Sequence, residues 1–427
     1  MAERLRSLGL PGIGNNNGTL PERFMRAIEL FAGAGGLGMG LSSAGFKPEM
    51  VLEWDRWCCD TIRENQRSGV SAVANWPEPT ESDIRSVEFA HLSGTIDLVS
   101  GGPPCQPFSL GGKHQAHNDR RDMWSEAVRV VREVQPRAFI FENVKGLTRS
   151  SFASYLAYIV HQLSYPEIVK FDDEDWASHL GRLEQHRTSG AQSGLRYNVV
   201  WQVLNAADFG VPQRRERVVF VGFRSDLGVA WNFPVKSHSI EALLWEQCRS
   251  GEYWDRHKVP LAARAVDARL LARALKLSDR PVSKPWRTVR DAIHDLPDPE
   301  LGGSSVLSNH RFQQGARSYP GHTGSPLDEA AKTLKAGVHG VPGGENMLLK
   351  RDGSVRYFTV RESARLQTFP DGYRLHGSWS EAMRQLGNAV PLELARSLAF
   401  DLAGHLGKTL PLIGKNREHD SRMLLRH

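Results

Sequence analysis

Residues 27–38 of the 427-residue chain read AIELFAGAGGLG, and this stretch decides the fold. Its first six residues are mainly apolar and predict a strand, after which Gly33, Gly35 and Gly38 match the spacing GxGxxG. A glycine-rich turn from a strand into a helix lets the backbone approach a ligand closely, because glycine has no Cβ atom. Glu53 lies about twenty residues further on, at the end of a second apolar run, where it is placed to bind ribose hydroxyls. The pattern is typical of a site for a dinucleotide or another adenosine-bearing cofactor, and a tight turn without a ligand is the alternative.

Strand-like and helix-like segments alternate through the first half of the chain. Short runs rich in Val, Ile and Phe are separated by amphipathic stretches, which favours an α/β fold with a mainly parallel sheet. The last two runs are close together in the sequence and could form an antiparallel pair. The expected strands are 27–32, 49–53, 96–100, 138–141, 199–204 and 217–223, and the expected helices are 55–66 and 123–134.

This alternation stops near residue 230. Residues 231–350 are rich in Gly, Pro, His and Ser, with Lys and Arg scattered among aromatic residues, and they predict a second, loop-rich domain. Helical patterning returns after residue 360, and the final segment is expected to pack back on the first domain. We therefore expect a large domain over 1–230, completed by 385–427, and a smaller domain with a hinge over 231–384.

Composition excludes several classes of protein. The 54 Lys and Arg against 48 Asp and Glu give a net charge of +6, which fits a polyanionic partner but is shared by many enzymes. No run approaches the ~18 apolar residues of a membrane span, and the first 26 residues hold no continuous apolar signal segment. The four cysteines are too few for a disulfide scaffold and form no CxxC pair, so we expect neither a structural metal site nor an oxidising compartment. The sequence predicts a soluble cytosolic protein.

A cysteine lies in a loop rich in glycine and proline, GGPPCQPFS over 101–109. The loop follows the expected strand 96–100, and open α/β sheets bind ligands at the carboxyl ends of their strands. Cys105 stands between prolines on a stiff, exposed loop, which favours the role of a nucleophile. A buried structural cysteine is the alternative.

Two charged groups are expected at the same edge of the sheet. Glu142 comes at the end of the expected strand 138–141, beside the cysteine loop, where partial desolvation would raise its pKa and favour proton donation. A surface salt bridge or a helix cap is the alternative for Glu142. The run QRRER over 213–217 enters the last expected strand and brings guanidinium groups towards this edge.

Eight segments together resemble the DNA (cytosine-5) methyltransferase family. They occur in the family's order between residues 28 and 400, and PPCQPFS and QRRERV are highly specific. The short leader before Phe31 is similar to that of stand-alone bacterial enzymes of restriction–modification systems. One departure is Met123, where members often carry Leu before an aromatic residue; Met123 should still pack against adenine. The matching segments are 31–36, 53–55, 83–84, 103–109, 142–144, 213–218, 361–370 and 387–391.

The resemblance implies a fold, a reaction and a set of catalytic residues. The fold is the Rossmann-like fold of S-adenosylmethionine-dependent methyltransferases, with a smaller target-recognition domain. The reaction transfers a methyl group to carbon 5 of a cytosine that is flipped out of double-stranded DNA. Cys105 would add to carbon 6 of the ring, and Glu142 would hold nitrogen 3 and support its protonation. Arg217 would hold the 2-oxo group, with Arg215 close behind.

The resemblance also implies the cofactor and the partners. S-adenosylmethionine would bind without a metal and leave as S-adenosylhomocysteine. The enzyme would act on duplex DNA as a monomer in the bacterial cytoplasm, associated with the nucleoid. It would pair functionally with a restriction endonuclease, from which it protects host DNA. The implied cofactor-binding positions are Phe31, Gly33, Gly35, Gly36, Glu53, Trp54, Asp83, Ile84, Pro104, Met123 and Asn388.

Three alternative functions leave parts of the sequence unexplained. A nicotinamide dehydrogenase accounts for GxGxxG but gives no role to PPCQPFS or QRRERV. A catalytically silent DNA-binding relative is disfavoured by the intact Cys105, Glu142 and Arg217. A tRNA-directed member typically has a compact variable domain, whereas the long segment between Phe223 and Arg361 favours duplex DNA.

The choice of DNA site is expected to reside in residues 231–350, the long segment without family motifs. Arg, Gln and Lys side chains suit guanine, adenine and phosphate, and three clusters supply them. A solvated loop is the alternative for each cluster. The clusters are 311–314, 317–319 and 332–335.

Overall fold

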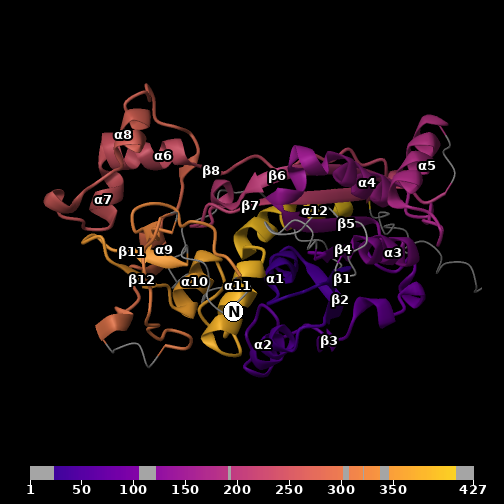
Figure 1. The fold of residues 1–427 in the computed structure, drawn as a ribbon, viewed down its shortest axis with the longest axis horizontal. Coiled ribbons are helices and arrows are strands. Elements are labelled where there is room, and N and C mark those ends of the chain that lie inside the picture. Colours follow the sequence, from indigo (N-terminus) through magenta and orange to yellow (C-terminus); the bar gives the residue numbers. More distant parts are fainter. Residues whose placement is uncertain are drawn as a thin grey trace, which may run out of the picture.

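A seven-stranded sheet runs through the larger lobe of the molecule, on the right of Figure 1. The computed structural model describes residues 24–104, 122–190, 194–301, 307–320, 322–336 and 346–409. The strand order is β3-β2-β1-β4-β5-β7-β6; β7 is antiparallel to both neighbours and the other pairs are parallel. The mainly parallel sheet and the antiparallel pair at its edge confirm the predicted α/β class. The strands are β1 (Met25–Leu30), β2 (Phe46–Glu53), β3 (Thr80–Glu81), β4 (Leu98–Gly101), β5 (Ala138–Val144), β6 (Tyr197–Asn205) and β7 (Glu216–Arg224).

Helices cover both faces of this sheet (Figure 1). Along β5, Phe139 and Phe141 face an apolar cluster with α3 and α4, whereas Ile140 faces a cluster with α1 and α12. Because the central strands are buried on both faces, they read as continuous apolar runs. The helices of this lobe include α1 (Gly36–Ser43), α2 (Arg56–Arg67), α3 (Trp124–Val134), α4 (Ala153–Ser164), α5 (Trp176–Thr188) and α12 (Leu392–Lys408).

Some element boundaries differ from those expected from the sequence. Asp55 and Met123 were expected inside helices, but each precedes its helix as the N-cap residue. The Asp55 carboxylate accepts a hydrogen bond from the backbone N of Cys58 at 3.1 Å, and this bond satisfies a donor of the first helical turn. Strand β2 begins at Phe46 rather than at residue 49. Its first half alternates between buried and exposed residues, so it does not stand out in the sequence as an apolar run.

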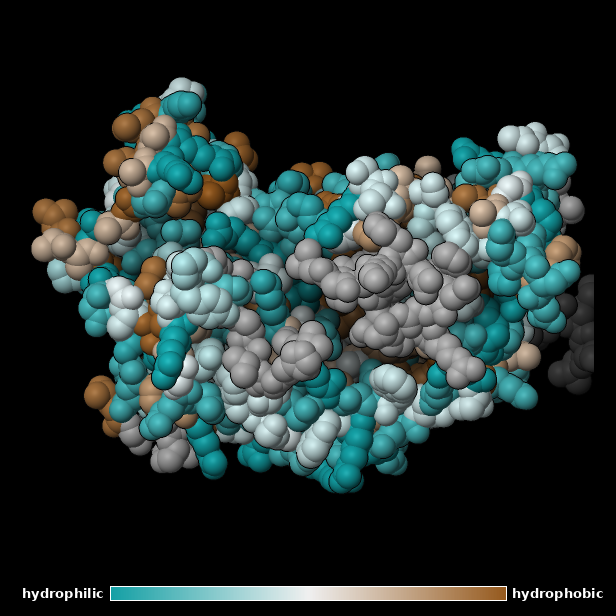
Figure 2. Space-filling model, in the orientation of Figure 1, coloured by the Kyte–Doolittle hydropathy of each residue, from teal (hydrophilic) through white to brown (hydrophobic). Residues whose placement is uncertain are grey.

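The smaller lobe, on the left of Figure 1, consists of short elements joined by loops. Two small apolar clusters hold it together, one around Val289 and Phe358 and the other around Tyr253 and Trp254. Figure 2 shows apolar surface gathered over α6–α8, while the other coloured residues of this face are mainly hydrophilic. The elements include β8 (His238–Ser239), α6 (Ile240–Trp245), α7 (Glu252–Arg256), α8 (Ala268–Ala274), β9 (Lys284–Pro285), α9 (Val289–Ile293), β10 (Ser325–Pro326), β11 (Met347–Leu349) and β12 (Val355–Tyr357).

Helix α11 (Trp379–Asn388) packs on the larger lobe, and α10 (Val360–Leu366) contacts both lobes, since Leu366 also belongs to the apolar cluster around Val289 and Phe358. Ala364 and Met383 belong to one apolar cluster with Ile62 and other residues of the first half of the chain. The expected division after residue 384 falls inside α11 and therefore does not match this packing. We propose instead that the smaller lobe ends near residue 359.

A carboxyl group, Glu29, is buried in the core under the glycine-rich turn. It bonds to the Ser100 hydroxyl on β4, and the backbone N of Gly38 also donates to it. Burial raises the pKa of Glu29 to about 8, against the lowering effect of these hydrogen bonds. At neutral pH the protonated acid can donate to the Ser100 hydroxyl, which in turn donates to the carbonyl of Ile28 at 3.1 Å.

We expect Glu29 to make the protein less stable as the pH rises. Between pH 4.5 and about 8 the folded state holds a proton on Glu29 that the unfolded state has lost. Over this range the free energy of unfolding therefore falls by up to about 1.4 kcal/mol for each unit that the pH rises. The Glu29→Gln side chain keeps a donor for Ser100 without a charge, so its urea-unfolding profile from pH 5 to 8.5 should lose this slope. Glu49→Gln, at an exposed carboxylate on β2, should keep it, and equal slopes in both variants would contradict the prediction.

Candidate active site

The glycine-rich turn between β1 and α1 forms one wall of the site. Phe31, Gly33 and Gly35 all have positive φ angles of 53°, 55° and 81°. A Cβ atom on Gly33 would meet no described atom within 4 Å, so the backbone is open to a ligand there. At Gly36 a Cβ would lie 2.3 Å from the carbonyl oxygen of Val390, which excludes larger residues. The predicted turn is thus tight on its protein side and open on the other.

Glu53, at the end of β2, holds this turn in place. Its carboxylate accepts hydrogen bonds from the backbone N of Gly33 at 2.7 Å, of Trp54 at 2.9 Å and of Asp55 at 2.8 Å. Burial raises the pKa of Glu53, and these hydrogen bonds oppose the shift. A carboxylate has about four lone-pair sites, so Glu53 retains room for a ribose hydroxyl. The Trp54 side chain beside it is 71% exposed and offers a free aromatic surface.

The remaining predicted cofactor positions differ in their exposure. Asp83 is half-buried and binds Arg85, whose hydrogen bonds lower the pKa of Asp83 to about 2. Ile84 is buried in the core cluster with Leu30, so it packs beneath the site and presents little surface to a ligand. Asn388 is exposed at the end of α11.

The structure describes the start of the cysteine loop only as far as Pro104 and resumes at Asp122. Gly101 ends β4, Pro104 is exposed, and the backbone N of Met123 donates to the Pro104 carbonyl at 3.2 Å. Cys105 itself lies outside the described residues. The Asn143 side chain donates to the carbonyl of Pro103 at 2.9 Å and so ties this segment to the end of β5. We did not predict a role for Asn143, although its place beside Glu142 was a signal.

Glu142 and Arg217 form a largely buried ion pair at the carboxyl edge of the sheet. Their strands are paired, with Val144 opposite Arg217, and Arg217 Nε lies 2.7 Å from Glu142 Oε1. Burial raises the pKa of Glu142, and the positive charges of Arg217 and Arg215 oppose this rise. Burial also lowers the pKa of Arg217. The structure therefore brings together two of the predicted catalytic side chains, a carboxyl group and a guanidinium group.

Arg215 is completely buried, and its hydrogen-bond partners are main-chain carbonyl groups. Its guanidinium donates to the carbonyls of Leu334 at 3.0 Å, Gly387 at 2.7 Å and Ala389 at 2.9 Å. Burial, and next the charge of Arg217, lower the pKa of Arg215 well below its usual value. These contacts fit a residue that positions Leu334 and the end of α11, and the catalytic role expected for Arg215 stays a prediction.

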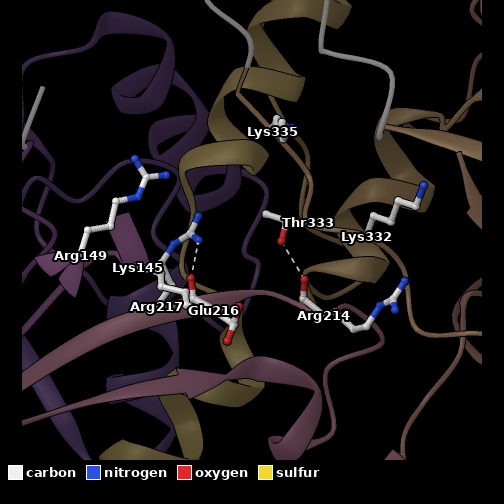
Figure 3. Close-up of a pocket in the computed structure, with 8 residues that line it drawn as sticks. All are labelled: Lys145, Arg149, Arg214, Glu216, Arg217, Lys332, Thr333 and Lys335. Carbon is white, nitrogen blue, oxygen red and sulfur yellow. Dashed lines mark hydrogen bonds and ion pairs between the residues drawn. The ribbon is translucent and has the colours of Figure 1, made fainter. Parts of the chain in front are cut away.

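Arg217 of the ion pair also lines a basic cleft of about 560 Å³, whose lining residues are drawn in Figure 3. Six of its eight lining residues are basic, and Glu216, the acidic one, is paired with Lys145 at 2.8 Å. The Thr333 hydroxyl donates to the carbonyl of Arg214 at 2.7 Å and joins the two sides of the cleft. The lining residues are Lys145, Arg149, Arg214, Glu216, Arg217, Lys332, Thr333 and Lys335.

The strand order and the site at the carboxyl edge define an S-adenosylmethionine-dependent methyltransferase fold. The model of the C-5 cytosine-specific DNA methylases matches residues 25–165 and 191–403. The chain belongs to this family and is a DNA (cytosine-5) methyltransferase, as the motifs predicted.

Individual relatives agree with the family. The chain is 31% identical over 385 residues to the Type II methyltransferase M.PspPI of a Psychrobacter species, covering 88% of this chain and 79% of that protein. It is 30% identical over 408 residues to the Type II methyltransferase M.XorII of Xanthomonas oryzae, covering 93% and 87%. The crystal structure of the S. pombe Dnmt2 methyltransferase matches 90% of this chain and 99% of its own, with 17% identity and a TM-score of 0.51. This last likeness concerns the fold alone.

Within the described ranges, no helix is both long and apolar enough to span a membrane. The same residues include no group of three or more His, Cys, Asp or Glu side chains that could hold a metal ion.

Proposed function

We propose that this enzyme methylates carbon 5 of a cytosine flipped out of duplex DNA, through a covalent adduct with Cys105. The observation that carries the proposal is the buried Glu142–Arg217 pair at the edge of a strongly basic cleft. The pair offers a proton or hydrogen-bond donor and a fixed positive charge, which is what a cytosine ring needs at nitrogen 3 and at its 2-oxo group. The cations around it suit the DNA backbone.

The chemistry explains why a thiol and a carboxyl group are both needed. Carbon 5 of cytosine is too weakly nucleophilic to attack a methyl donor. Addition of the Cys105 thiolate at carbon 6, with a proton held by Glu142 at nitrogen 3, turns the ring into an enamine that can attack. Once carbon 5 carries the methyl group, a base removes the proton from carbon 5, and the Cys105 sulfur leaves as the bond between carbons 5 and 6 becomes double again. The proton at nitrogen 3 returns to Glu142. Arg217 would hold the 2-oxo group throughout.

The residues around the glycine-rich turn fit S-adenosylmethionine. The open side of Gly33 accepts a ligand against the backbone, Glu53 can accept ribose hydroxyls, and the exposed Trp54 offers a surface to an adenine ring. Phe31, Gly35, Gly36, Asp83, Pro104, Met123 and Asn388 would complete the site, with Ile84 packed beneath it. Bound S-adenosylmethionine would supply an electrophilic methyl group and leave as S-adenosylhomocysteine.

The biological role we propose is protection of host DNA from a cognate restriction endonuclease. It is supported by the relatives named as Type II methyltransferases. We propose that the enzyme works as a monomer on the bacterial nucleoid.

Transfer of tritiated methyl groups tests the proposed substrate. The purified protein should label duplex DNA and leave tRNA unlabelled, and bisulfite sequencing of a treated plasmid should show one short sequence context. Labelling of tRNA alone would assign the enzyme to the tRNA-directed alternative. Absence of any labelled nucleic acid would contradict the proposal.

We expect Arg317 to take part in the choice of DNA site. Arg311, Arg317 and Tyr319 are exposed on the smaller lobe, where side chains can reach base edges. Arg317→Ala should relax the preference at one base pair, with a loss of about 1–3 kcal/mol of discrimination, or weaken all sites equally if Arg317 binds phosphate. Sequencing of methylated plasmid libraries measures this, and an unchanged site with unchanged affinity would exclude Arg317 from DNA recognition.

A further inference from the structure

A second basic pocket lies on the smaller lobe, apart from the basic cleft. It has a volume of about 240 Å³, and we call it the distal pocket. It is formed where β8 and β9 pair in parallel and where α7 and α9 approach them. Its lining residues are His238, Arg256, Lys284, Pro285, Trp286, Arg287 and Asp291.

The positive charges of the distal pocket exceed its negative charge. Asp291 is already engaged, because it caps α9 and bonds to His257 at 2.7 Å. Lys284 and Arg287 are exposed, and neither forms an ion pair with an acidic side chain of the described ranges. The pKa of His238 falls to about 4, first through burial and next through the charges of Lys284 and Arg287. The pocket therefore presents two uncompensated cations beside a neutral histidine.

The floor of the distal pocket is held rigidly. The Trp286 indole donates to the carboxylate of Asp208 at 3.0 Å, and the backbone N of Trp286 donates to the carbonyl of Ser239 at 3.0 Å. The backbone N of Lys284 donates to the carbonyl of Ser237 at 2.9 Å. A fixed backbone reduces the entropy lost when these side chains bind a ligand.

The distal pocket and the basic cleft lie at the same edge of the sheet. Strand β6 runs parallel to β5, because both are antiparallel to β7, and Asp208 follows the carboxyl end of β6. Arg214, which lines the cleft, lies six positions after Asp208, which holds Trp286. Their Cα atoms can thus be at most about 22 Å apart. One turn of duplex DNA spans about 34 Å, so a duplex held at the cleft is long enough to reach the distal pocket.

We propose that the distal pocket binds a phosphate of the DNA backbone within one helical turn of the flipped cytosine. The inference rests on the proposed function and names a second DNA contact for it. Arg287 can bind two phosphate oxygens in its planar fork, and Lys284 adds a mobile charge. A phosphate contact carries no sequence information, so the distal pocket adds affinity and register without affecting which site is methylated.

The salt dependence of DNA binding tests this contact. The Lys284→Ala/Arg287→Ala double variant and the wild type are compared on a duplex of about 30 base pairs that contains the sequence methylated by the wild type. Loss of one phosphate contact should reduce the slope of log affinity against log salt by about 1. Affinity at 0.1 M NaCl should fall about tenfold, and kcat at saturating DNA should stay within about twofold of wild type.

A matched double variant separates this contact from a general loss of charge. Arg273→Ala/Arg280→Ala removes two exposed arginines of the same lobe that are paired with Glu241 and Glu252. Its slope should stay close to that of the wild type. An unchanged slope in the distal-pocket variant, or an equal reduction in both variants, would overturn the proposal.

Two further outcomes are distinguishable. In a second experiment, ten millimolar inorganic phosphate is added to both proteins. If it raises the melting temperature of the wild type but not of the Lys284→Ala/Arg287→Ala variant, and the two DNA slopes are equal, the pocket binds a small anion and the proposal is overturned. Failure of the wild type to methylate DNA at all would refute the proposed function itself, whatever the slopes.

Discussion

Cys105→Ser should abolish methyl transfer and leave the binding of S-adenosylmethionine and DNA nearly intact. A serine hydroxyl is far less ionised than a thiol near neutral pH, so addition to carbon 6 should almost stop. The binding surfaces belong to other residues, chiefly the turn at Gly33 with Glu53 and the basic cleft. Tritium transfer measures the reaction, and gel shift with equilibrium dialysis measures the two affinities.

DNA that carries 5-fluorocytosine at the target should trap the wild-type enzyme. Fluorine cannot be removed as a proton, so the adduct should survive denaturing electrophoresis in the wild type and be absent in Cys105→Ser. Cys248→Ser is the matched control, since Cys248 is a half-buried free cysteine of the smaller lobe. It should react as the wild type does. No adduct with the wild type, or turnover in Cys105→Ser, would refute the covalent mechanism.

Glu142→Gln should lower the rate of the chemical step by about 10² or more, with little change in cofactor affinity. The amide keeps the size of the side chain and can donate one hydrogen bond, but it cannot supply a proton to nitrogen 3. Single-turnover experiments at saturating DNA and S-adenosylmethionine isolate this step. A rate within a few fold of wild type would show that Glu142 has a structural role.

Glu142→Gln also leaves the buried charge of Arg217 without a negatively charged partner, so stability has to be measured together with the rate. A buried charge that loses its partner destabilises a protein by about 3–5 kcal/mol, and the melting temperature should fall. Glu216→Gln removes the same charge from the same edge of the sheet, but from an exposed pair with Lys145. This control should change neither the melting temperature nor the single-turnover rate appreciably.

The parts of the structure predicted best from the sequence are those with a strong local pattern. The apolar runs of the central strands are buried on both faces, so their composition predicts them without knowledge of their neighbours. The turn around Gly33 and Gly35 was predicted because its positive φ angles favour glycine. The meeting of Glu142 with the 213–217 segment followed from their positions at strand ends.

The parts that could not be predicted depend on packing between distant segments. In QRRER the side chains of Arg215 and Arg217 are two residues apart, which suggests a common face of one strand. Both side chains are in fact largely buried, with Glu216 exposed between them, but only Arg217 pairs with Glu142. Arg215 donates instead to main-chain carbonyls that lie 119 to 174 residues further along the chain, and no local pattern reveals these partners. Likewise, the place of residues 360–388 on the larger lobe rests on contacts with residues 32–76 that no local pattern reveals.

Part of the joint between the lobes is made through main-chain atoms of the smaller lobe. Arg215 donates to the carbonyl of Leu334, and the backbone N of Arg214 donates to the carbonyl of Ala331 at 2.7 Å. Such bonds depend on the path of the chain and scarcely on which side chains it carries. Recognition segments could therefore diverge in sequence, or be exchanged between related enzymes, while the attachment to the catalytic lobe stays the same. New target sites could then arise in evolution without any redesign of the methyl-transfer chemistry.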